Sequence, residues 1–252
     1  MNSVYVTVDV DWAPDWAIER LLDALLQGGV RSTWFITHET ELLGKLRQHP
    51  DLVDLGIHPN FLPGSSQGSS TSQVLAECMR IVPEARTMRT HCLVQSTAIL
   101  QAAVAETPIE LDTSLYLRGA TGVDVTELPL AGRSLARVPY VWEDDLEFFA
   151  RDPRWDGAAF IEERSDRPGI TIVDLHPIHV ALNSSRVEPY ASLKATKPDL
   201  RRVSEGEARR HTSHEPGAAT FLDSLIVACR ATGVRLDRPL AGLIDRLAPG
   251  TD

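Results

Sequence analysis

Polar side chains that could bind a metal or transfer protons stand at the ends of apolar segments in this sequence. They are Asp9 and Asp11, His58, His91, and Asp174 and His176. Pro59 directly after His58 ends its segment sharply, as expected where a rigid scaffold presents a ligand at its edge. If the apolar segments are parallel strands, their carboxyl ends meet at one face, where α/β proteins build active sites. We therefore expect these side chains to share one site.

The two N-terminal aspartates suggest a cation. Asp9 and Asp11 are two residues apart, so in a continuing strand their carboxylates face the same side. Neighbouring carboxylates repel, so either one holds a proton or a cation lies between them. Imidazoles from His58 and His91 would complete a mixed nitrogen and oxygen donor set, which suits zinc or a similar divalent ion. The alternative is that both aspartates cap the following helix, where Asp15 is the more natural N-cap.

The segments that must position these residues alternate between apolar runs and amphipathic stretches. The predicted strands are 4–10, 32–36, 53–57, 87–91, 111–114 and 170–175, and the predicted helices are 16–26, 39–48, 72–81, 96–106 and 219–232. Nearly continuous apolar strands that alternate with amphipathic helices are typical of a parallel sheet covered by helices. The polar stretches 63–72 and 183–215 lack a clear period and are predicted to be loops, either surface connections or a cover over a substrate groove.

Composition excludes several classes of protein. The 252 residues fit one large α/β domain spanning residues 1–252, with an ordinary 43% hydrophobic and 24% charged content. The net charge of −10 argues against nucleic acid as a partner. Three cysteines without a C-x-x-C spacing indicate neither a disulfide framework nor a thiolate zinc site. Without a membrane-length apolar run or a signal-like start, the chain is expected to be cytoplasmic.

Four segments together resemble the polysaccharide deacetylase (NodB-homology) family. Thr7-Val8-Asp9-Val10-Asp11, Ser32-Thr33-Trp34-Phe35, Asp54-Leu55-Gly56-Ile57-His58-Pro59 and Ile172-Val173-Asp174-Leu175-His176-Pro177 are similar to its motifs in order and spacing, and the resemblance touches most of residues 4–180. It implies a distorted (β/α) barrel of about seven parallel strands. It also implies a metal-dependent hydrolase that removes an acyl group, expected to be acetyl, from an N-acylated sugar or polysaccharide precursor. The resemblance links the chain to bacterial surface polysaccharide synthesis, such as that of the lipopolysaccharide O-antigen.

The family motifs imply a role for each matching position. Asp9 would be the general base, Asp11 and His58 ligands of a divalent metal ion, most simply zinc, Arg89 the residue that orients the base, and His176 the general acid. Val10 separates two aspartates that are adjacent in the family, so the roles of Asp9 and Asp11 are open to exchange. The segment around Arg89 also lacks the family's proline, which indicates a divergent branch.

The third metal ligand is missing from its usual place. Leu62 occupies the position of the family's second histidine, four residues after His58. We assign His91 as the third ligand, with Asn60 or His179 as substitutes.

A carbohydrate substrate would need aromatic faces and hydrogen-bonding groups. The residues expected to supply them are Trp12, Asn60, Tyr140, Trp142 and Asp144. The segment 139–145, which contains three of them, also fits a second interpretation, the acidic start of a helix.

Three other functions stay open from the sequence alone. A glycoside hydrolase on a similar barrel would use paired carboxylates without a metal and would give no role to His58 or His91. A catalytically inactive carbohydrate-binding relative would have lost the metal together with the second histidine. An amidohydrolase acting on another non-peptide C–N bond would share fold and chemistry and differ in its substrate.

Overall fold

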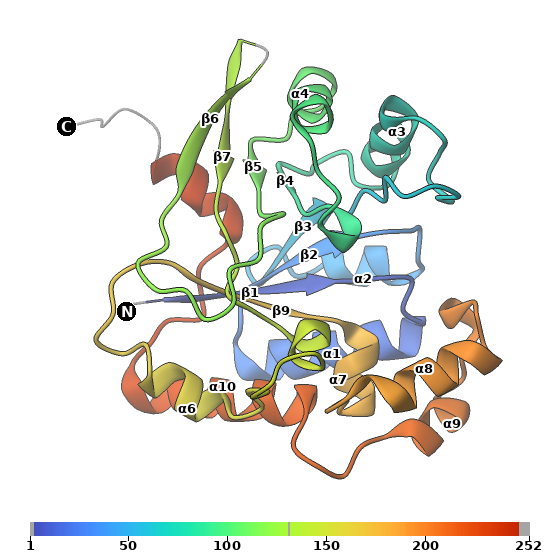
Figure 1. Ribbon diagram of the computed structural model, residues 1–252, viewed down its shortest axis with the longest axis vertical. Coiled ribbons are helices and arrows are strands. Elements are labelled where there is room, and N and C mark those ends of the chain that lie inside the picture. The colour runs from blue at the N-terminus through green and yellow to red at the C-terminus, as the bar shows by residue number, and fades with distance from the viewer. Residues whose placement is uncertain (1–2, 131, 247–252) are drawn as a thin grey trace.

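The computed structural model describes residues 3–130 and 132–246 and is built around one sheet (Figure 1). Its strands are β1 (Val4–Asp9), β2 (Ser32–Ile36), β3 (Val53–Ile57), β4 (Thr87–Met88), β5 (Leu111–Asp112), β6 (Thr126–Leu130), β7 (Arg133–Arg137), β8 (Trp142–Glu143) and β9 (Thr171–Leu175). Their order is β6-β7-β5-β4-β3-β2-β1-β9-β8. Neighbouring strands are parallel except for the β6–β7 hairpin, which is antiparallel. The carboxyl ends of the parallel strands therefore meet at one face.

The sheet closes into a distorted barrel through the segment that starts as β7 and continues into β8. Ala136 of β7 pairs with Leu111 of β5, whereas Trp142 of β8 pairs with Val173 of β9. Between them, the N–H of Tyr140 donates to the carbonyl of Leu115, after β5. With β7 and β8 taken as one bent strand, β1, β2, β3, β4, β5, β7–β8 and β9 are the parallel strands of the barrel. The predicted fold class is confirmed.

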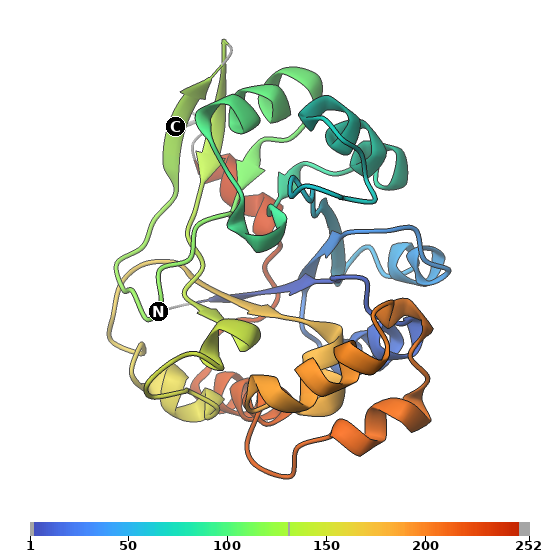
Figure 2. The ribbon, with the colours of Figure 1, turned by 45° about the vertical axis from the view of Figure 1, so that its right-hand side comes forward.

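Helices cover the outside of this barrel, as Figures 1 and 2 show. They are α1 (Asp15–Gly28), α2 (Leu42–Arg47), α3 (Thr71–Ile81), α4 (Thr97–Glu106), α5 (Asp144–Glu147), α6 (Gly157–Glu162), α7 (Pro177–Leu182), α8 (Val187–Thr196), α9 (Glu205–Ala208) and α10 (Ala218–Thr232), with 3-10 turns η1 (His91–Leu93), η2 (Leu200–Arg202), η3 (Arg209–His211) and η4 (Leu240–Arg246). Helix α1 packs against α7, and α10 packs against α6 and α7. None of the described helices has the length and apolarity needed to cross a membrane.

The core explains why these segments form these elements. All six residues of β1 are buried, as expected for a strand covered on both faces. Helix α1 buries Ile18, Leu21, Leu22 and Leu25 at three- and four-residue spacing, which places them on one face. Each such side chain stabilises the fold by about 1.5–3 kcal/mol. Gly29 ends α1 in a left-handed conformation (φ 60°), which glycine adopts without the steric cost of a side chain.

The second predicted loop, 183–215, is wrong, because this stretch contains α8, α9, η2 and η3. These elements bury a small separate core of Ile178, Leu182, Leu193, Leu200, Val203 and Ala208. Only Leu193 of α8 is buried, so the helix has no apolar stripe that a sequence pattern could reveal. The β6–β7 hairpin and α6 were also not predicted.

Candidate active site

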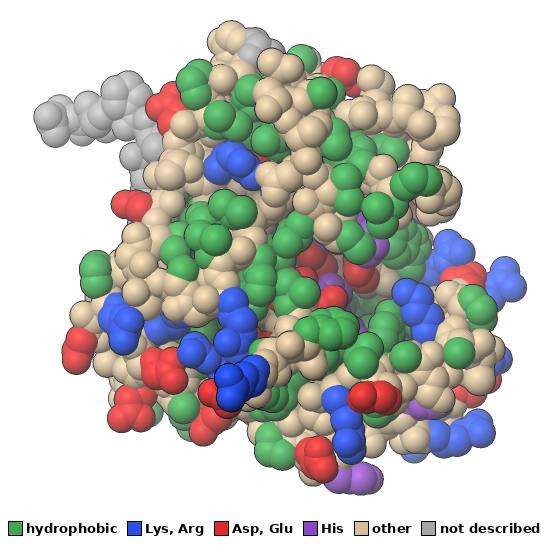
Figure 3. Space-filling view, in the orientation of Figure 1, with side chains coloured by type: hydrophobic (Ala, Val, Ile, Leu, Met, Phe, Trp, Pro, Cys, Tyr) green, Lys and Arg blue, Asp and Glu red, His purple; other side chains and the backbone are tan. Residues whose placement is uncertain are grey.

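A cavity of about 250 Å³ opens at the carboxyl ends of the barrel strands. Its lining residues are Asp9, Asp11, His58, Thr90, His91, Cys92, Leu93, Glu143, Asp145, Leu146 and His176. In the space-filling view, acidic and histidine side chains gather in a hollow bordered by hydrophobic groups (Figure 3). The sequence-predicted residues of the metal and proton-transfer site therefore do come together.

Asp11 reaches this cavity through a strained turn. Strand β1 ends at Asp9, and both Asp11 (φ 44°) and Trp12 (φ 54°) are left-handed. This conformation costs a non-glycine residue about 1–2 kcal/mol. The expectation that a continuing strand would point both aspartates to one side is thus corrected, because the carboxylates share the cavity only where the chain leaves the strand.

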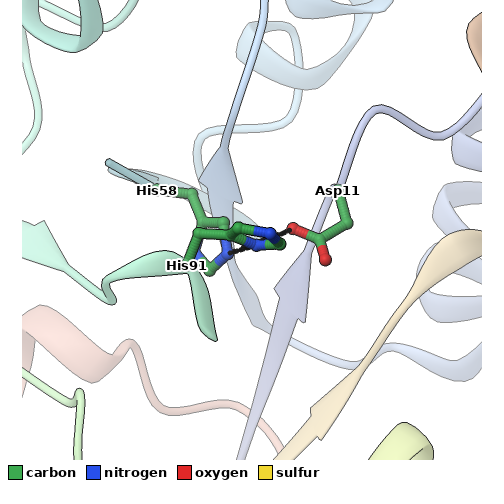
Figure 4. A group of neighbouring side chains, drawn as sticks. All are labelled: Asp11, His58 and His91. Atoms are coloured by element: carbon green, nitrogen blue, oxygen red, sulfur yellow. Dashed lines mark hydrogen bonds and ion pairs between the residues drawn. The ribbon is translucent and has the colours of Figure 1, made fainter. Parts of the chain in front are cut away.

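Asp11, His58 and His91 bring three potential metal donors together (Figure 4). Asp11 Oδ1 lies 3.1 Å from His58 Nε2 and 3.0 Å from His91 Nδ1, and the two imidazole nitrogens are 3.3 Å apart. Ligands about 2.0–2.1 Å from a tetrahedral zinc ion would be separated by about 3.3 Å. The donor set therefore fits a divalent ion such as zinc in both chemistry and spacing.

The electrostatics of this group favour an ionised carboxylate. Burial alone would raise the pKa of Asp11, but hydrogen bonds with His58 and His91 hold it well below its usual value. Asp11 is therefore charged at neutral pH, as a metal ligand must be.

Asp9 lies 3.6 Å from His58 Nε2 and is also held by a buried arginine. Its Oδ1 lies 3.0 Å from Nη1 of Arg89, which is fully buried and also contacts Asp174. Arg89 Nη2 donates to Thr7 Oγ1 at 3.0 Å, which fixes the guanidinium. Burial raises the pKa of Asp9 to about 6, although Arg89 opposes that shift. This carboxylate is thereby tuned toward the range of a general base.

His176 is held by a buried carboxylate. Its Nδ1 lies 2.7 Å from Asp144 Oδ1, and its backbone N–H donates to Asp144 Oδ2 at 2.9 Å. Its Nε2 faces the donor group, 3.6 Å from Asp11 Oδ2. Burial would lower the pKa of His176, but the charges of Asp144 and Asp145 raise it well above its usual value. His176 is therefore set to carry a proton into the cavity.

The position of Asp144 differs from that expected of a substrate contact. The pairing of Glu143 with Asp174 aligns β8 and β9, so that Asp144 lies fully buried behind His176. Its contacts fit the orientation of that imidazole. No sequence signal links two residues that are 32 positions apart.

Two predicted aromatic contacts do not line the described cavities. Trp142 is fully buried and stacks on Phe221, with ring centroids 3.6 Å apart. Tyr140 is also fully buried; its hydroxyl donates to Glu143 Oε2 at 2.5 Å and its ring lies 4.2 Å from the Arg89 guanidinium carbon. Tyr140 therefore supports Glu143 and Arg89 from behind, whereas Trp142 packs against α10.

The remaining predicted residues lie around the donor group. Trp12 contacts the His91 ring edge-on, with centroids 5.1 Å apart, and lines a neighbouring cavity. Asn60 accepts a hydrogen bond from the N–H of Leu62 and thereby orders the following loop. His179 is buried, with Nδ1 3.3 Å from Ser184 Oγ. His179 lies outside the group formed by Asp11, His58 and His91, and neither Asn60 nor His179 lines the cavity.

Cys92 at the rim and Tyr190 in the neighbouring cavity were missed by sequence reasoning. Tyr190 lies on α8, inside the stretch predicted to be a loop. Cys92 directly follows His91, and this position next to a predicted ligand is the sequence feature that could have indicated it.

Comparisons with known proteins agree with this architecture. A solved structure from Bordetella bronchiseptica, assigned as a polysaccharide deacetylase involved in O-antigen biosynthesis, is 29% identical with a TM-score of 0.73, and the match covers 89% of each chain. The Xyl-CE4 domain of a xylanase from the hindgut metagenome of Trinervitermes trinervoides shares the fold at 10% identity and a TM-score of 0.50, over 99% of this chain and 92% of that one. No match was found among curated proteins. The model of the WbmS-like polysaccharide deacetylases matches residues 6–194, and the chain therefore belongs to that family.

Proposed function

We propose that the protein is a metal-dependent hydrolase that removes an acyl group, expected to be acetyl, from an N-acylated sugar of a polysaccharide precursor. The observation that carries this proposal is the donor triangle of Asp11, His58 and His91, with Asp9 on one side and His176 on another. Family membership and the O-antigen assignment of the relative from Bordetella bronchiseptica support a surface-polysaccharide substrate.

Hydrolysis of an acetamide needs a strong nucleophile and a proton for the departing amine. A divalent ion held by Asp11, His58 and His91 would supply a water acidic enough to react near pH 7 and would polarise the acyl oxygen. Asp9 would accept the proton of the attacking water, and Arg89 keeps that carboxylate in place. His176 would donate its Nε2 proton to the sugar nitrogen, a general-acid step worth about 10²–10⁴ in rate.

Particular contacts favour this function over its alternatives. Arg89 pairs with both Asp9 and Asp174, so these two are not a free acid and base as glycoside hydrolysis needs. A metal-free pair of carboxylates would also give no role to His58 and His91, which both contact Asp11 in the cavity. The inactive relative was suggested by the missing second histidine. The contacts of His91 with Asp11 and His58 support His91 as the third ligand in its place. An amidohydrolase for other amides differs only in substrate.

Metal content tests the proposal. We expect about one ion per chain, by mass spectrometry of protein purified without chelator, and acetate release from an N-acetylated sugar. His58→Ala and His91→Ala should each lose the ion and the activity, because each removes one of three donors. The control His214→Ala, at an exposed position, should keep both.

Two outcomes would separate the alternatives. Wild-type protein that binds no ion, even after reconstitution with zinc, cobalt, nickel or manganese, would contradict the proposed mechanism. Bound metal without acetate release from any N-acetylated sugar tested would favour another amide as substrate.

A further inference from the structure

A second cavity of about 430 Å³ adjoins the candidate active site. It is lined by Asp11, Trp12, His91, Tyr190, Lys194, Pro198, Asp199, Leu200 and Arg201. Asp11 and His91 line both cavities, so one ligand could extend from the first into the second. Helix α8 and η2 form the outer wall of this second cavity, so part of the stretch 183–215 borders the site.

The two cavities differ in charge. The first is lined by the carboxylates of Asp9, Asp11, Glu143 and Asp145, and no lysine or arginine is among its lining residues. The second adds Lys194 and Arg201. A ligand that spans both would therefore place its neutral acylamino group in the first cavity and any negative charge in the second.

Lys194 supplies the uncompensated charge of the second cavity. Arg201 is tied to the carboxylate of Asp199, with Nε at 2.8 Å and Nη2 at 3.0 Å. By contrast, no carboxylate of residues 3–130 or 132–246 lies within ion-pair distance of Lys194, whose described contact is the ring of Tyr190, 5.7 Å from Nζ. A free ammonium group beside a cavity attracts an anion.

Aromatic side chains give this cavity rigid walls. Trp12 packs edge-on against the His91 ring, with centroids 5.1 Å apart. Tyr190 packs on the buried ring of His179, with centroids 4.5 Å apart. Flat apolar faces of this kind contact sugar or base rings, while a charged group beside them fixes orientation.

We propose that the second cavity binds an anionic group of the substrate, a carboxylate or a phosphate, with Lys194 as its counter-ion and with Trp12 and Tyr190 as aromatic walls. This inference rests on the proposed function for the identity of the acylated sugar. The acylated substrate is then an acidic sugar or a sugar linked through phosphate to a carrier. Lys194 acts as a specificity-determining residue and takes no part in bond cleavage.

Binding of three probes tests the proposal. They are N-acetylglucosamine, its uronic acid and uridine-diphosphate-linked N-acetylglucosamine, titrated calorimetrically into zinc-reconstituted protein carrying Asp9→Asn, which removes the proposed base and keeps the probes intact. We expect at least one anionic probe to bind roughly tenfold more tightly than the neutral sugar. That advantage should shrink when sodium chloride is raised from about 0.05 to about 0.5 M, because screening weakens exposed charges.

Variants at Lys194 identify the counter-ion. Lys194→Ala should reduce the anion advantage roughly three- to tenfold, and Lys194→Arg should restore most of it. Lys197→Ala is the matched control. Lys197 directly follows the last residue of α8, but it does not line the second cavity and its ammonium pairs with Glu207 at 2.7 Å. Preference for the uronic acid alone would identify a carboxylate, and preference for the nucleotide sugar alone a phosphate.

The result that overturns the inference is distinct from failure of the proposed function. Equal binding of all three probes, no measurable binding of either anionic probe, or an anion advantage that survives in Lys194→Ala would refute it. Acetate release by the wild-type protein is measured separately. Absence of that activity would contradict the proposed function and leave the binding comparison intact.

Discussion

The contact between Asp144 and His176 yields the sharpest prediction about catalysis. Asp144→Asn removes a buried charge that accepts two hydrogen bonds from His176, at 2.7 and 2.9 Å. A hydrogen bond to a charged group contributes about 1.5–3 kcal/mol. If the side-chain bond acts mainly on the protonated imidazole, its loss should lower kcat roughly 10- to 150-fold, since 1.4 kcal/mol is about tenfold in rate. KM should change little, because Asp144 does not line the cavity.

The pH dependence gives the same substitution a second readout. The charge of Asp144 raises the pKa of His176, so its removal should let the proton leave at lower pH. The alkaline limb of the kcat profile should then move to lower pH. Acetate release is measured between about pH 5 and pH 10, where His and its neighbours titrate, with the exposed Asp124→Asn as control. A kcat within twofold of wild type and an unmoved alkaline limb would refute the reasoning.

Three further predictions concern stability and can be measured by urea unfolding. Arg89→Met should destabilise the fold by about 3–5 kcal/mol, because it leaves buried carboxylates without their partner; an unchanged midpoint would contradict this. Gly56→Ala should lower the free energy of unfolding by about 1–3 kcal/mol, since a Cβ there would lie 2.6 Å from the hydroxyl of Thr87. Gly44→Ala in α2 is the control: its Cβ would meet nothing within 4 Å, so it should raise the free energy of unfolding by about 0.5–1 kcal/mol. Burial lowers the pKa of His38 to about 4, so the stability that its neutral form provides is complete above about pH 6.5 and is lost as the pH falls toward 4. His38→Gln should therefore make the free energy of unfolding fall less steeply between about pH 6.5 and about pH 4. An unchanged pH dependence would contradict this prediction.

Sequence reasoning located the barrel because its strands are buried on both faces. Ser32–Ile36 and Val53–Ile57 were predicted with the bounds that the structure shows, since short, mainly apolar segments between predicted helices leave little ambiguity. Strands β4 and β5 are only two residues long, so their predicted versions extended too far. The length of such a short strand is set by its pairing with neighbouring strands, and a local sequence pattern carries no information about that pairing.

The site was partly predictable for the same reason. Asp9, His58 and His176 could be placed because Asp9 ends one strand and each histidine directly follows another. The role of Asp144 depends on the register of β8 against β9, and the wall formed by Tyr190 depends on a helix that buries a single residue. Both arise from tertiary packing, so neither leaves a periodic signal in the sequence.

The left-handed pair at Asp11 and Trp12 has a consequence for variation at this site. Asn or Gly would relax the backbone at position 12 by roughly 1 kcal/mol. Either would also delete an aromatic wall shared with His91. Selection for stability alone would therefore favour asparagine or glycine at position 12. If Trp12 contacts the substrate as proposed, selection for substrate recognition would instead keep tryptophan there. Stability and recognition pull in opposite directions at this residue, which makes position 12 a site for measuring that trade-off directly.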